Sequence, residues 1–338
     1  MRIAVLGRTS LLYNTLRLLE QAGHDIVLIG TCKAAPEYEK TEADFEKYST
    51  DRKIPFFCNA NLNDLQIASM LDEAKADIAV SINWVNIINA ETIDRFKFGI
   101  LNVHAGDLPR YRGNACPNWA IILREKEIAV CVHFMAPDKL DSGDILIKKY
   151  MQISSKTRIG EIYAWLEEIV PCMIVEAISG LENGVLIPQE QSKDTSMWLR
   201  VYPRVPADSL IDWRMNAESI ERLINASSEP FAGAYTFYNL KKLIIWRAHA
   251  GKWDCPSVAV PGQVVIRDCG TGMVGIACGD GIISLEEVEV EGTRGKPYDV
   301  IKSMRARLGM IVEEEIFKLK SQLDDLINAV HMKDESNN

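Results

Sequence analysis

The sequence has no long apolar run and no cysteine pair at metal-binding spacing. Its eight cysteines include no C-x-x-C pair, and no His/Cys cluster has the spacing of a zinc site, so no metal site is expected. Several cysteines lie in apolar stretches, which favours buried, reduced thiols. No apolar stretch approaches the ~20 residues that a membrane span needs, and residues 1–7 have the composition of a strand, not of a secretion signal. We therefore expect a soluble, cytoplasmic protein.

An excess of positive charge is also missing. The 338 residues contain 38 basic and 47 acidic side chains, a formal net charge of −9. Such a chain tends to repel polyphosphate backbones unless a local basic patch compensates, which counts against a nucleic-acid partner. The apolar content of 47% is enough for sizeable cores, and the length is enough for two or three domains.

The first half of the chain alternates between strand and helix patterns. Residues 2–6 and 25–30 are short apolar runs, and a helical repeat of leucines lies between them. This βαβ unit implies parallel strands joined by a right-handed crossover. The alternation continues to a long helix predicted over 157–181, so we expect residues 1–187 to form a doubly wound, Rossmann-like α/β domain with a mostly parallel sheet. Gly7 follows the first strand without a G-x-G-x-x-G pattern, which argues against a dinucleotide site.

The second half changes character after a polar stretch that contains prolines. We interpret residues 188–207 as a linker. Five short strand patterns separated by Gly or Pro breaks follow, which is typical of a small β-barrel of the OB type over residues 208–297. Residues 298–338 are predicted to form a helical tail. The tail and the β-rich second domain suggest a homodimer, and a monomer stays open.

Two separated segments carry the most distinctive motif. Residues 102–113 read Asn-Val-His-Ala-Gly-Asp-Leu-Pro-Arg-Tyr-Arg-Gly, and Asp-Ser-Gly-Asp follows at 141–144. Asn102 and His104 are two residues apart at the end of a predicted strand, so their side chains point to the same side. In open parallel sheets, ligands bind beyond the carboxyl ends of the strands. Each residue alone has an ordinary structural role, as a buried histidine or a turn former, but the combination favours a catalytic site.

This string resembles the signature of folate-dependent formyltransferases, an Asn-x-His pair followed by Leu-Pro-x-(Tyr/Phe)-Arg-Gly and a later Asp-x-Gly. The likeness to the methionyl-tRNA formyltransferase superfamily spans nearly the whole chain, including residues 204–208 and 261–264 of the second half. The resemblance implies that N10-formyltetrahydrofolate is the formyl donor. It also implies a catalytic trio of Asn102, His104 and Asp141.

The chemistry of formyl transfer onto an amine suits these three side chains. His104 can take the proton that the attacking amine loses, because imidazole exchanges protons near neutral pH. The Asn102 amide can donate to the developing oxyanion, a contact worth roughly 2.7–4 kcal/mol where such donors have been removed from other enzymes. Asp141 can orient the imidazole and stabilise its charged form, or relay a proton through water.

Further residues near the motif are candidates for binding. The stretch after the preceding strand has exposed backbone that can bind a flat heterocycle, although Trp84 can also simply pack, and Gly113 permits a close backbone approach to a ligand. The predicted cofactor-binding residues are Ile82, Asn83, Trp84, Leu108, Arg112, Gly113 and Asp141. The predicted substrate-binding residues are Arg8, Thr9, Ser10 and Arg110, with simple surface exposure as the alternative for Arg110.

Charge separates the branches that share this framework. One branch formylates methionyl-tRNA, another formylates an amino group on a nucleotide-linked sugar, and glycinamide ribonucleotide formyltransferases normally lack the second domain. The tRNA enzymes use a basic inserted loop and a basic second domain. Here residues 33–53 hold five basic and six acidic residues, and residues 205–290 hold seven basic and eleven acidic residues, a net of −4. Binding of tRNA should rest on many phosphate contacts, and we interpret the basic cluster at 302–307 as a solvated helical face.

We therefore predict an enzyme, a folate-dependent N-formyltransferase. It would move the formyl group of N10-formyltetrahydrofolate to the amino group of a dTDP-, UDP- or GDP-linked amino deoxysugar, for the biosynthesis of surface polysaccharide such as the O-antigen of lipopolysaccharide. No nucleic-acid or membrane partner is expected. The alternative is a methionyl-tRNA formyltransferase. A third hypothesis, without catalysis, is a folate- or nucleotide-binding regulator on the same scaffold.

Overall fold

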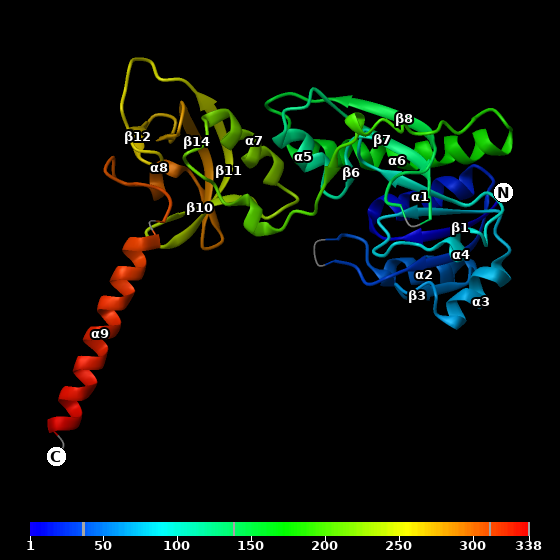
Figure 1. The fold of residues 1–338 in the computed structure, drawn as a ribbon, viewed down its shortest axis with the longest axis horizontal. Coiled ribbons are helices and arrows are strands. Elements are labelled where there is room, and N and C mark those ends of the chain that lie inside the picture. The colour runs from blue at the N-terminus through cyan, green and yellow to red at the C-terminus, as the bar shows by residue number, and fades with distance from the viewer. Residues whose placement is uncertain (36–37, 138, 311, 337–338) are drawn as a thin grey trace. The chain divides into compact units, whose positions relative to one another are not determined.

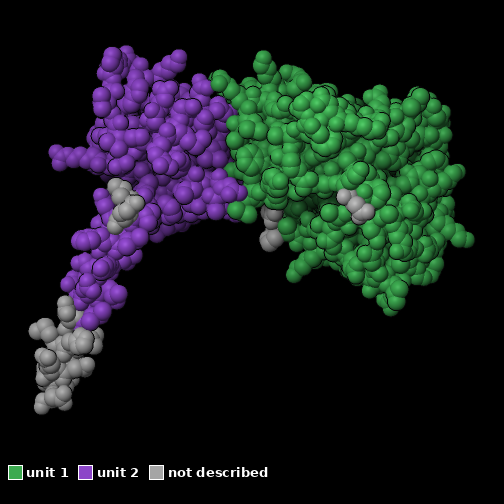
Figure 2. Space-filling model, in the orientation of Figure 1, with its two compact units in different colours: residues 1–205 green, residues 206–338 purple. Residues whose placement is uncertain are grey.

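The computed structural model describes residues 1–35, 38–137, 139–310 and 312–336. It divides into two compact units, residues 1–205 and residues 206–338, which Figure 2 shows in different colours. Each unit is built around its own sheet (Figure 1). Within the described ranges, no helix combines the length and the apolar character needed to cross a membrane.

Unit 1 is built on a seven-stranded, mostly parallel sheet in the order β3-β2-β1-β4-β5-β7-β8. The strands are β1 (Arg2–Gly7), β2 (Asp25–Thr31), β3 (Phe56–Cys58), β4 (Ile78–Ile82), β5 (Ile100–His104), β7 (Glu127–Phe134) and β8 (Ile145–Gln152). β1 pairs in parallel with β2 and with β4, whereas β7 pairs antiparallel with β5 and with β8. β4 is buried along its whole length, as expected for a central strand covered on both faces. The predicted Rossmann-like class is confirmed.

The helices of unit 1 connect these strands. They are α1 (Thr9–Gln21), α2 (Glu42–Arg52), α3 (Leu65–Ala74), α4 (Ala90–Ile93), α5 (Cys116–Ile122) and α6 (Ile159–Glu182). Asp64 caps α3, because its carboxylate accepts hydrogen bonds from the backbone N–H groups of Gln66 and Ile67. The helix predicted over 157–181 is α6. The sequence pattern does not predict α2, because its stretch is highly polar and only Phe45, Tyr48 and Ser49 of it are buried.

The predicted linker at 188–207 lies largely within unit 1, which ends at residue 205. Its residues include a short 3-10 turn, η1 (Thr195–Met197), and strand β9 (Arg200–Val201). β9 pairs in parallel with β6 (Arg112–Gly113), so the chain after α6 returns to the motif at 102–113. This ladder of two short strands places a polar segment beside residues that are distant in sequence.

Unit 2 is a small antiparallel sheet domain, in agreement with the predicted class. Its sheet runs β10-β11-β14-β13-β12, with β15 on β14. The elements are η2 (Pro206–Ser209), α7 (Ala217–Ser227), β10 (Ala234–Tyr238), β11 (Lys241–Gly251), β12 (Val264–Arg267), β13 (Val274–Ala277), β14 (Ile282–Val290), β15 (Thr293–Gly295), α8 (Pro297–Val300) and α9 (Val312–Ser336). Alternating apolar side chains such as Leu243 and Ile245 are fully buried and form its core.

The tail helix begins later than the predicted boundary at residue 298. Among the residues of this tail that the structure describes, only the four-residue α8 and then α9, from Val312, are helical. Residues between them pack against the strands instead: Leu308 is buried and its N–H donates to the Gly262 carbonyl, and the Gly309 N–H donates to the Phe237 carbonyl. The basic cluster at 302–307 therefore lies in this non-helical stretch and not on a helical face.

Candidate active site

A cavity of about 400 Å³ lies at the carboxyl ends of β4 and β5 in unit 1. One side of it is the loop that follows β4, where Trp84, Val85, Ile87 and Ile88 supply apolar surface. The other side is polar and contains the ends of β5 and β7 and the loop up to Asp141. The volume is within the range of small-molecule sites, and an apolar wall beside a few polar groups suits a flat heterocyclic ligand.

His104, the last residue of β5, is 7% exposed and lines this cavity. Its Nε2 lies 2.6 Å from the carbonyl oxygen of Tyr111. A carbonyl only accepts hydrogen bonds, so Nε2 carries the proton and Nδ1 is the basic nitrogen of the neutral ring. Nδ1 lies 3.6 Å from Oδ1 of Asp141. The Tyr111 backbone therefore fixes the tautomer of the ring, and the free ring nitrogen faces the carboxylate.

Asp141 is held by backbone and side-chain contacts from two other segments. Its Oδ2 accepts a hydrogen bond of 2.9 Å from the Gly113 N–H. Its own carbonyl and that of Gly143 accept hydrogen bonds of 3.0 and 2.8 Å from Nε2 of Gln191. The oxygen of the same amide accepts from Arg112 at 2.6 Å. Gln191 is 7% exposed, so this buried amide joins the Asp141 loop to strand β6.

Asn102 is oriented by a histidine on the neighbouring antiparallel strand. The β5–β7 register sets Asn102 opposite His133, and the Asn102 amide nitrogen lies 3.1 Å from Nε2 of His133. Nδ1 of His133 lies 2.8 Å from the Phe134 carbonyl, so it carries the proton and Nε2 accepts from the amide. An amide nitrogen has two hydrogens, and the second remains to donate into the cavity that Asn102 lines.

Burial controls the charge state of groups around the trio. Burial, and next the proximity of His104, lower the pKa of His133 to about 4, so this ring is neutral at pH 7. Cys116 lies close to the site, with its Sγ 3.6 Å from Nε2 of His104, but burial raises the pKa of its thiol to about 12. A thiol that stays protonated is a poor nucleophile, which disfavours covalent catalysis by Cys116.

Six of the residues predicted from sequence line the cavity. They are Asn83, Trp84, Asn102, His104, Gly113 and Asp141. Asn83 has a left-handed backbone with φ of 56°, and Trp84 packs partly against the unit 1 core. No group of three or more metal-binding side chains occurs among the residues that the structure describes.

The other predicted binding residues lie behind or beside the cavity lining. Ile82 and Leu108 are buried, and their carbonyls accept from Arg8 N and from Lys148 Nζ respectively. The guanidinium of Arg8 donates to the Asn83 carbonyl, directly behind the lining. Ser10 donates to Glu167 on α6 at 2.7 Å.

Two arginines of the motif differ in their surroundings. The Arg110 side chain, which is about half exposed, forms an ion pair of 2.8 Å with Glu125. The Arg112 guanidinium lies over the Trp198 ring at 4.4 Å, and burial lowers its pKa. The Thr9 hydroxyl is buried, and within the described chain it has no hydrogen-bond partner. The catalytic roles and ligand contacts of all these residues, inside and outside the lining, stay predictions.

The fold and this site agree with the result of comparison with known families. The family described as "Formyl transferase" matches residues 1–178. The family described as "Formyl transferase, C-terminal domain" matches residues 205–303. The chain belongs to the formyl transferase family. This family uses N10-formyltetrahydrofolate, and the predicted formyl donor is thus confirmed at the level of the family.

Six curated relatives of the chain are methionyl-tRNA formyltransferases. That of Alkaliphilus oremlandii is 28% identical over 303 residues, which cover 87% of this chain and 93% of the relative. That of Citrifermentans bemidjiense is 27% identical over 300 residues, which cover 88% of this chain and 91% of the relative. Six such relatives are 24–28% identical over 87–91% of the chain.

Solved structures share the fold at lower identity. The N-formyltransferase of Helicobacter canadensis, in complex with folinic acid and dTDP-3-aminofucose, has a TM-score of 0.59 and 15% identity, covering 85% of this chain and 99% of that chain. HypX of Aquifex aeolicus in complex with tetrahydrofolic acid has a TM-score of 0.59 and 19% identity, covering 90% of this chain and 47% of that chain. At such identities the likeness shows the fold alone.

The prediction of a nucleotide-linked sugar as substrate is therefore wrong. The six curated relatives above resemble the chain in sequence over most of its length and are tRNA enzymes, whereas the Helicobacter canadensis N-formyltransferase resembles it in fold at 15% identity. The prediction rested on charge counted over whole stretches. A net charge averages all faces of a segment, so it does not reveal which cations lie beside the site, where Lys139 and Arg200 line the cavity.

Proposed function

We propose that this protein transfers the formyl group of N10-formyltetrahydrofolate to the α-amino group of methionyl-tRNA. The chemistry is supported by one observation above all: Asn102, His104 and Asp141 meet at a single cavity at the carboxyl end of the sheet. The tRNA substrate is supported by the six methionyl-tRNA formyltransferases that resemble the chain over most of its length.

In this proposal each of the three side chains has a distinct task. The amine of the acceptor attacks the formyl carbon, a new C–N bond forms, and the bond from that carbon to N10 breaks. Nδ1 of His104 takes the proton that the amine loses, and returns it as N10 leaves as an amine. Asp141, 3.6 Å from this nitrogen, stabilises the imidazolium. The free N–H of Asn102 donates to the formyl oxygen as negative charge develops there.

The cavity also has features that suit the two reactants. The apolar side chains of the loop after β4 can cover the pterin ring of the donor. Lys139 and Arg200 line the same cavity and place positive charge where the phosphates near the acceptor end of tRNA would approach. Two local cations do not replace a broad basic surface, so we expect binding with a shallow salt dependence.

The test is a formylation assay with purified full-length protein, formyl-folate and charged initiator tRNA, followed by mass analysis of the released methionine. We expect formylmethionine, and we expect no product from a nucleotide-linked amino sugar used for comparison. His104→Asn should lower turnover by at least about 100-fold, with circular dichroism unchanged. Formylation of the sugar in place of the tRNA would reject the substrate, and near-normal turnover of the variant would reject the proton transfer.

Arg200→Ala provides a separate test of the substrate. We expect KM for methionyl-tRNA to rise by about 5- to 10-fold. The slope of the logarithm of the binding constant against the logarithm of the salt concentration should decrease in magnitude by about one. The value of kcat should change little, because Arg200 does not belong to the trio. Lys97→Ala, at an exposed position of the same unit outside the cavity lining, serves as the charge-matched control. Equal effects of both substitutions would contradict a specific role for Arg200.

A further inference from the structure

Helix α9 carries an apolar seam that the rest of unit 2 leaves exposed. The seam consists of Val312, Ile316, Leu319, Leu323 and Leu326, which recur alternately every four and every three residues. Their side chains are 53% to 65% exposed. The helix begins beyond residue 303, where the family match ends, so the seam is not part of the shared catalytic framework.

The spacing of the seam is that of a coiled coil. In heptad notation Ile316 and Leu323 fall at position a, and Val312, Leu319 and Leu326 fall at position d. Ile or Val at a with Leu at d favours two strands, and the first a–d step, Ile316 to Leu319, has this form. A helix in water gains most of its stability when its apolar face packs. We therefore expect the exposed seam to pack against a second helix with the same a/d pattern.

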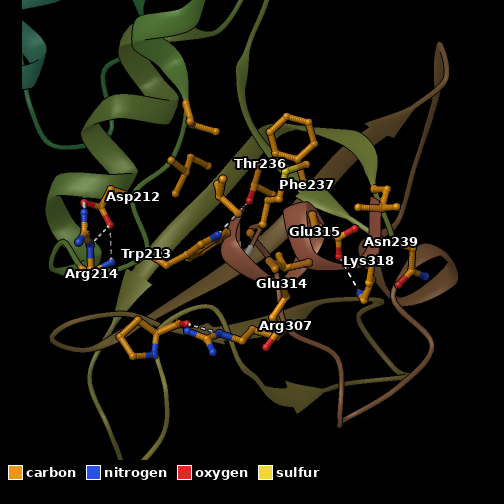
Figure 3. A pocket seen from close by; sticks show the side chains of 18 of the residues that line it. Asp212, Trp213, Arg214, Thr236, Phe237, Asn239, Arg307, Glu314, Glu315 and Lys318 are labelled. Carbon is orange, nitrogen blue, oxygen red and sulfur yellow. Dashed lines mark hydrogen bonds and ion pairs between the residues drawn. The ribbon is translucent and has the colours of Figure 1, made fainter. Parts of the chain in front are cut away.

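The charges beside the seam match those of a second copy of the chain. Glu315 falls at position g, and Lys320 falls at position e of the following heptad. In a parallel pair of helices, g of one helix meets the following e of the other, so Glu315 of each copy would face Lys320 of the other. Figure 3 shows the Glu315 carboxylate paired with Lys318 of its own helix, at 2.8 Å.

The surface next to the first turns of α9 is open and partly apolar. A cavity of about 1080 Å³ lies between the start of α9 and the strands of unit 2 (Figure 3). Leu210 and Leu240, exposed by 47% and 64%, line it together with Leu319. The strands of unit 2 thus leave room beside the seam instead of covering it.

We propose that two copies of this chain associate through a parallel, two-stranded coiled coil of their α9 helices. The occupant of the seam is thus a second α9, selected by the a/d pattern and by two Glu315–Lys320 pairs across the interface. The association needs neither the cavity of unit 1 nor its substrates, so it can be tested apart from catalysis.

The mass of the full-length protein in solution gives the first test. Light scattering at about 50 μM should give twice the chain mass of 37.9 kDa. Leu319→Glu combined with Leu323→Glu should raise the dissociation constant by at least about 100-fold and give a monomer, because it buries unpaired carboxylates. Ser321→Glu, at the outer position f, should remain a dimer. A monomeric natural protein, a larger oligomer, or a dimer unaffected by the double substitution would overturn the proposal.

A charge exchange tests the parallel orientation without changing apolar surface. Glu315→Lys alone and Lys320→Glu alone should each weaken association by about 10-fold, because each places like charges at g and e. The double variant Glu315→Lys/Lys320→Glu should restore the natural affinity, as the pairs are reversed but complementary. If the double variant is as weak as, or weaker than, the single variants, the parallel arrangement is wrong. Sedimentation equilibrium at low salt measures all four proteins.

Discussion

The Asn102 side-chain amide donates to Nε2 of His133, at 3.1 Å across the antiparallel β5–β7 pair. The proton of His133 is on Nδ1, which donates to the Phe134 carbonyl. This arrangement fixes both the amide and the ring without using the second amide hydrogen. In the proposed mechanism, the donor for the formyl oxygen is thus held in place in advance of ligand binding, which is the preorganisation that electrostatic catalysis requires.

Replacement of His133 should slow catalysis through Asn102, whose amide it orients. We expect His133→Leu to lower kcat by about 10- to 100-fold with little change in KM, because the Asn102 amide loses the acceptor that orients it. His133→Gln keeps an oxygen acceptor and should recover most of the rate. Steady-state kinetics on the two variants makes the comparison. Equal rates for Leu and Gln would contradict the positioning role.

The buried, neutral state of His133 also predicts a loss of stability in acid. Its pKa is lowered to about 4 in the folded protein, so between pH 6.5 and 4 the unfolded chain binds a proton that the folded chain does not. The corresponding stability is present above pH 6.5 and is lost as the pH falls toward 4. Between pH 7 and pH 5 the loss from this group is about 2 kcal/mol.

Urea unfolding of unit 1 at pH 7 and pH 5 measures this effect. His24, whose pKa burial also lowers, contributes in the same direction, so the natural protein alone does not isolate His133. The comparison is the difference between the natural protein and His133→Gln at each pH. We expect the variant to lose about 2 kcal/mol less than the natural protein. An identical pH dependence in both proteins would show that His133 is not the group responsible.

Gln191 should support the position of Asp141 from a distance. Gln191→Leu removes both hydrogen bonds to the carbonyls of the Asp141 loop and leaves Arg112 without its amide partner. We expect about 2 kcal/mol less stability, because buried polar groups lose their partners, and a lower kcat, because Asp141 is no longer held beside His104. Gln189→Leu, at an exposed position of the same segment, is the control. Denaturant titration and kinetics should separate the two variants clearly.

The sequence predicted those parts of the site that depend on local order. Asn102 and His104 share one strand, and the resemblance to the formyltransferase signature connects them to Asp141, so all three could be assigned to one site from the sequence. His133 could not, because its role follows from the antiparallel pairing of β5 with β7, and no local pattern encodes that register. Gln191 lies in a polar stretch with the composition of a linker, and only the β6–β9 pairing returns it to the site.

Among the helices and strands, too, some boundaries follow from the local sequence and others depend on tertiary contacts. Strands such as β1 and β4 are short apolar runs with clear ends, so their positions follow from the sequence. The start of α9 does not follow from the sequence, because the residues after α8 have helical composition but donate backbone hydrogen bonds to strands and loops of unit 2. Tertiary contacts there override local propensity. Total charge also misled the choice of substrate, because a sum over a segment does not show where its charges lie.

Gly113 is the position where the smallest change should damage the site most. Its φ is 122°, and a Cβ there would lie 2.0 Å from the Val201 carbonyl oxygen. Gly113→Ala must therefore separate β6 from β9 and move the N–H that holds Asp141. We expect a loss of about 3 kcal/mol or more in stability and a strong fall in kcat.

The matched control for this change is Gly184→Ala, after α6. Gly184 also has a positive φ, 66°, but a Cβ there meets no atom within 4 Å. Gly184→Ala should lower the free energy of unfolding by only about 1 kcal/mol, which is the strain of the left-handed backbone, and should leave kcat unchanged. Thermal unfolding and formylation kinetics on both variants distinguish general backbone strain from displacement of Asp141. If Gly113→Ala lost stability but kept its turnover, the Gly113 N–H would not be needed to hold the carboxylate during catalysis.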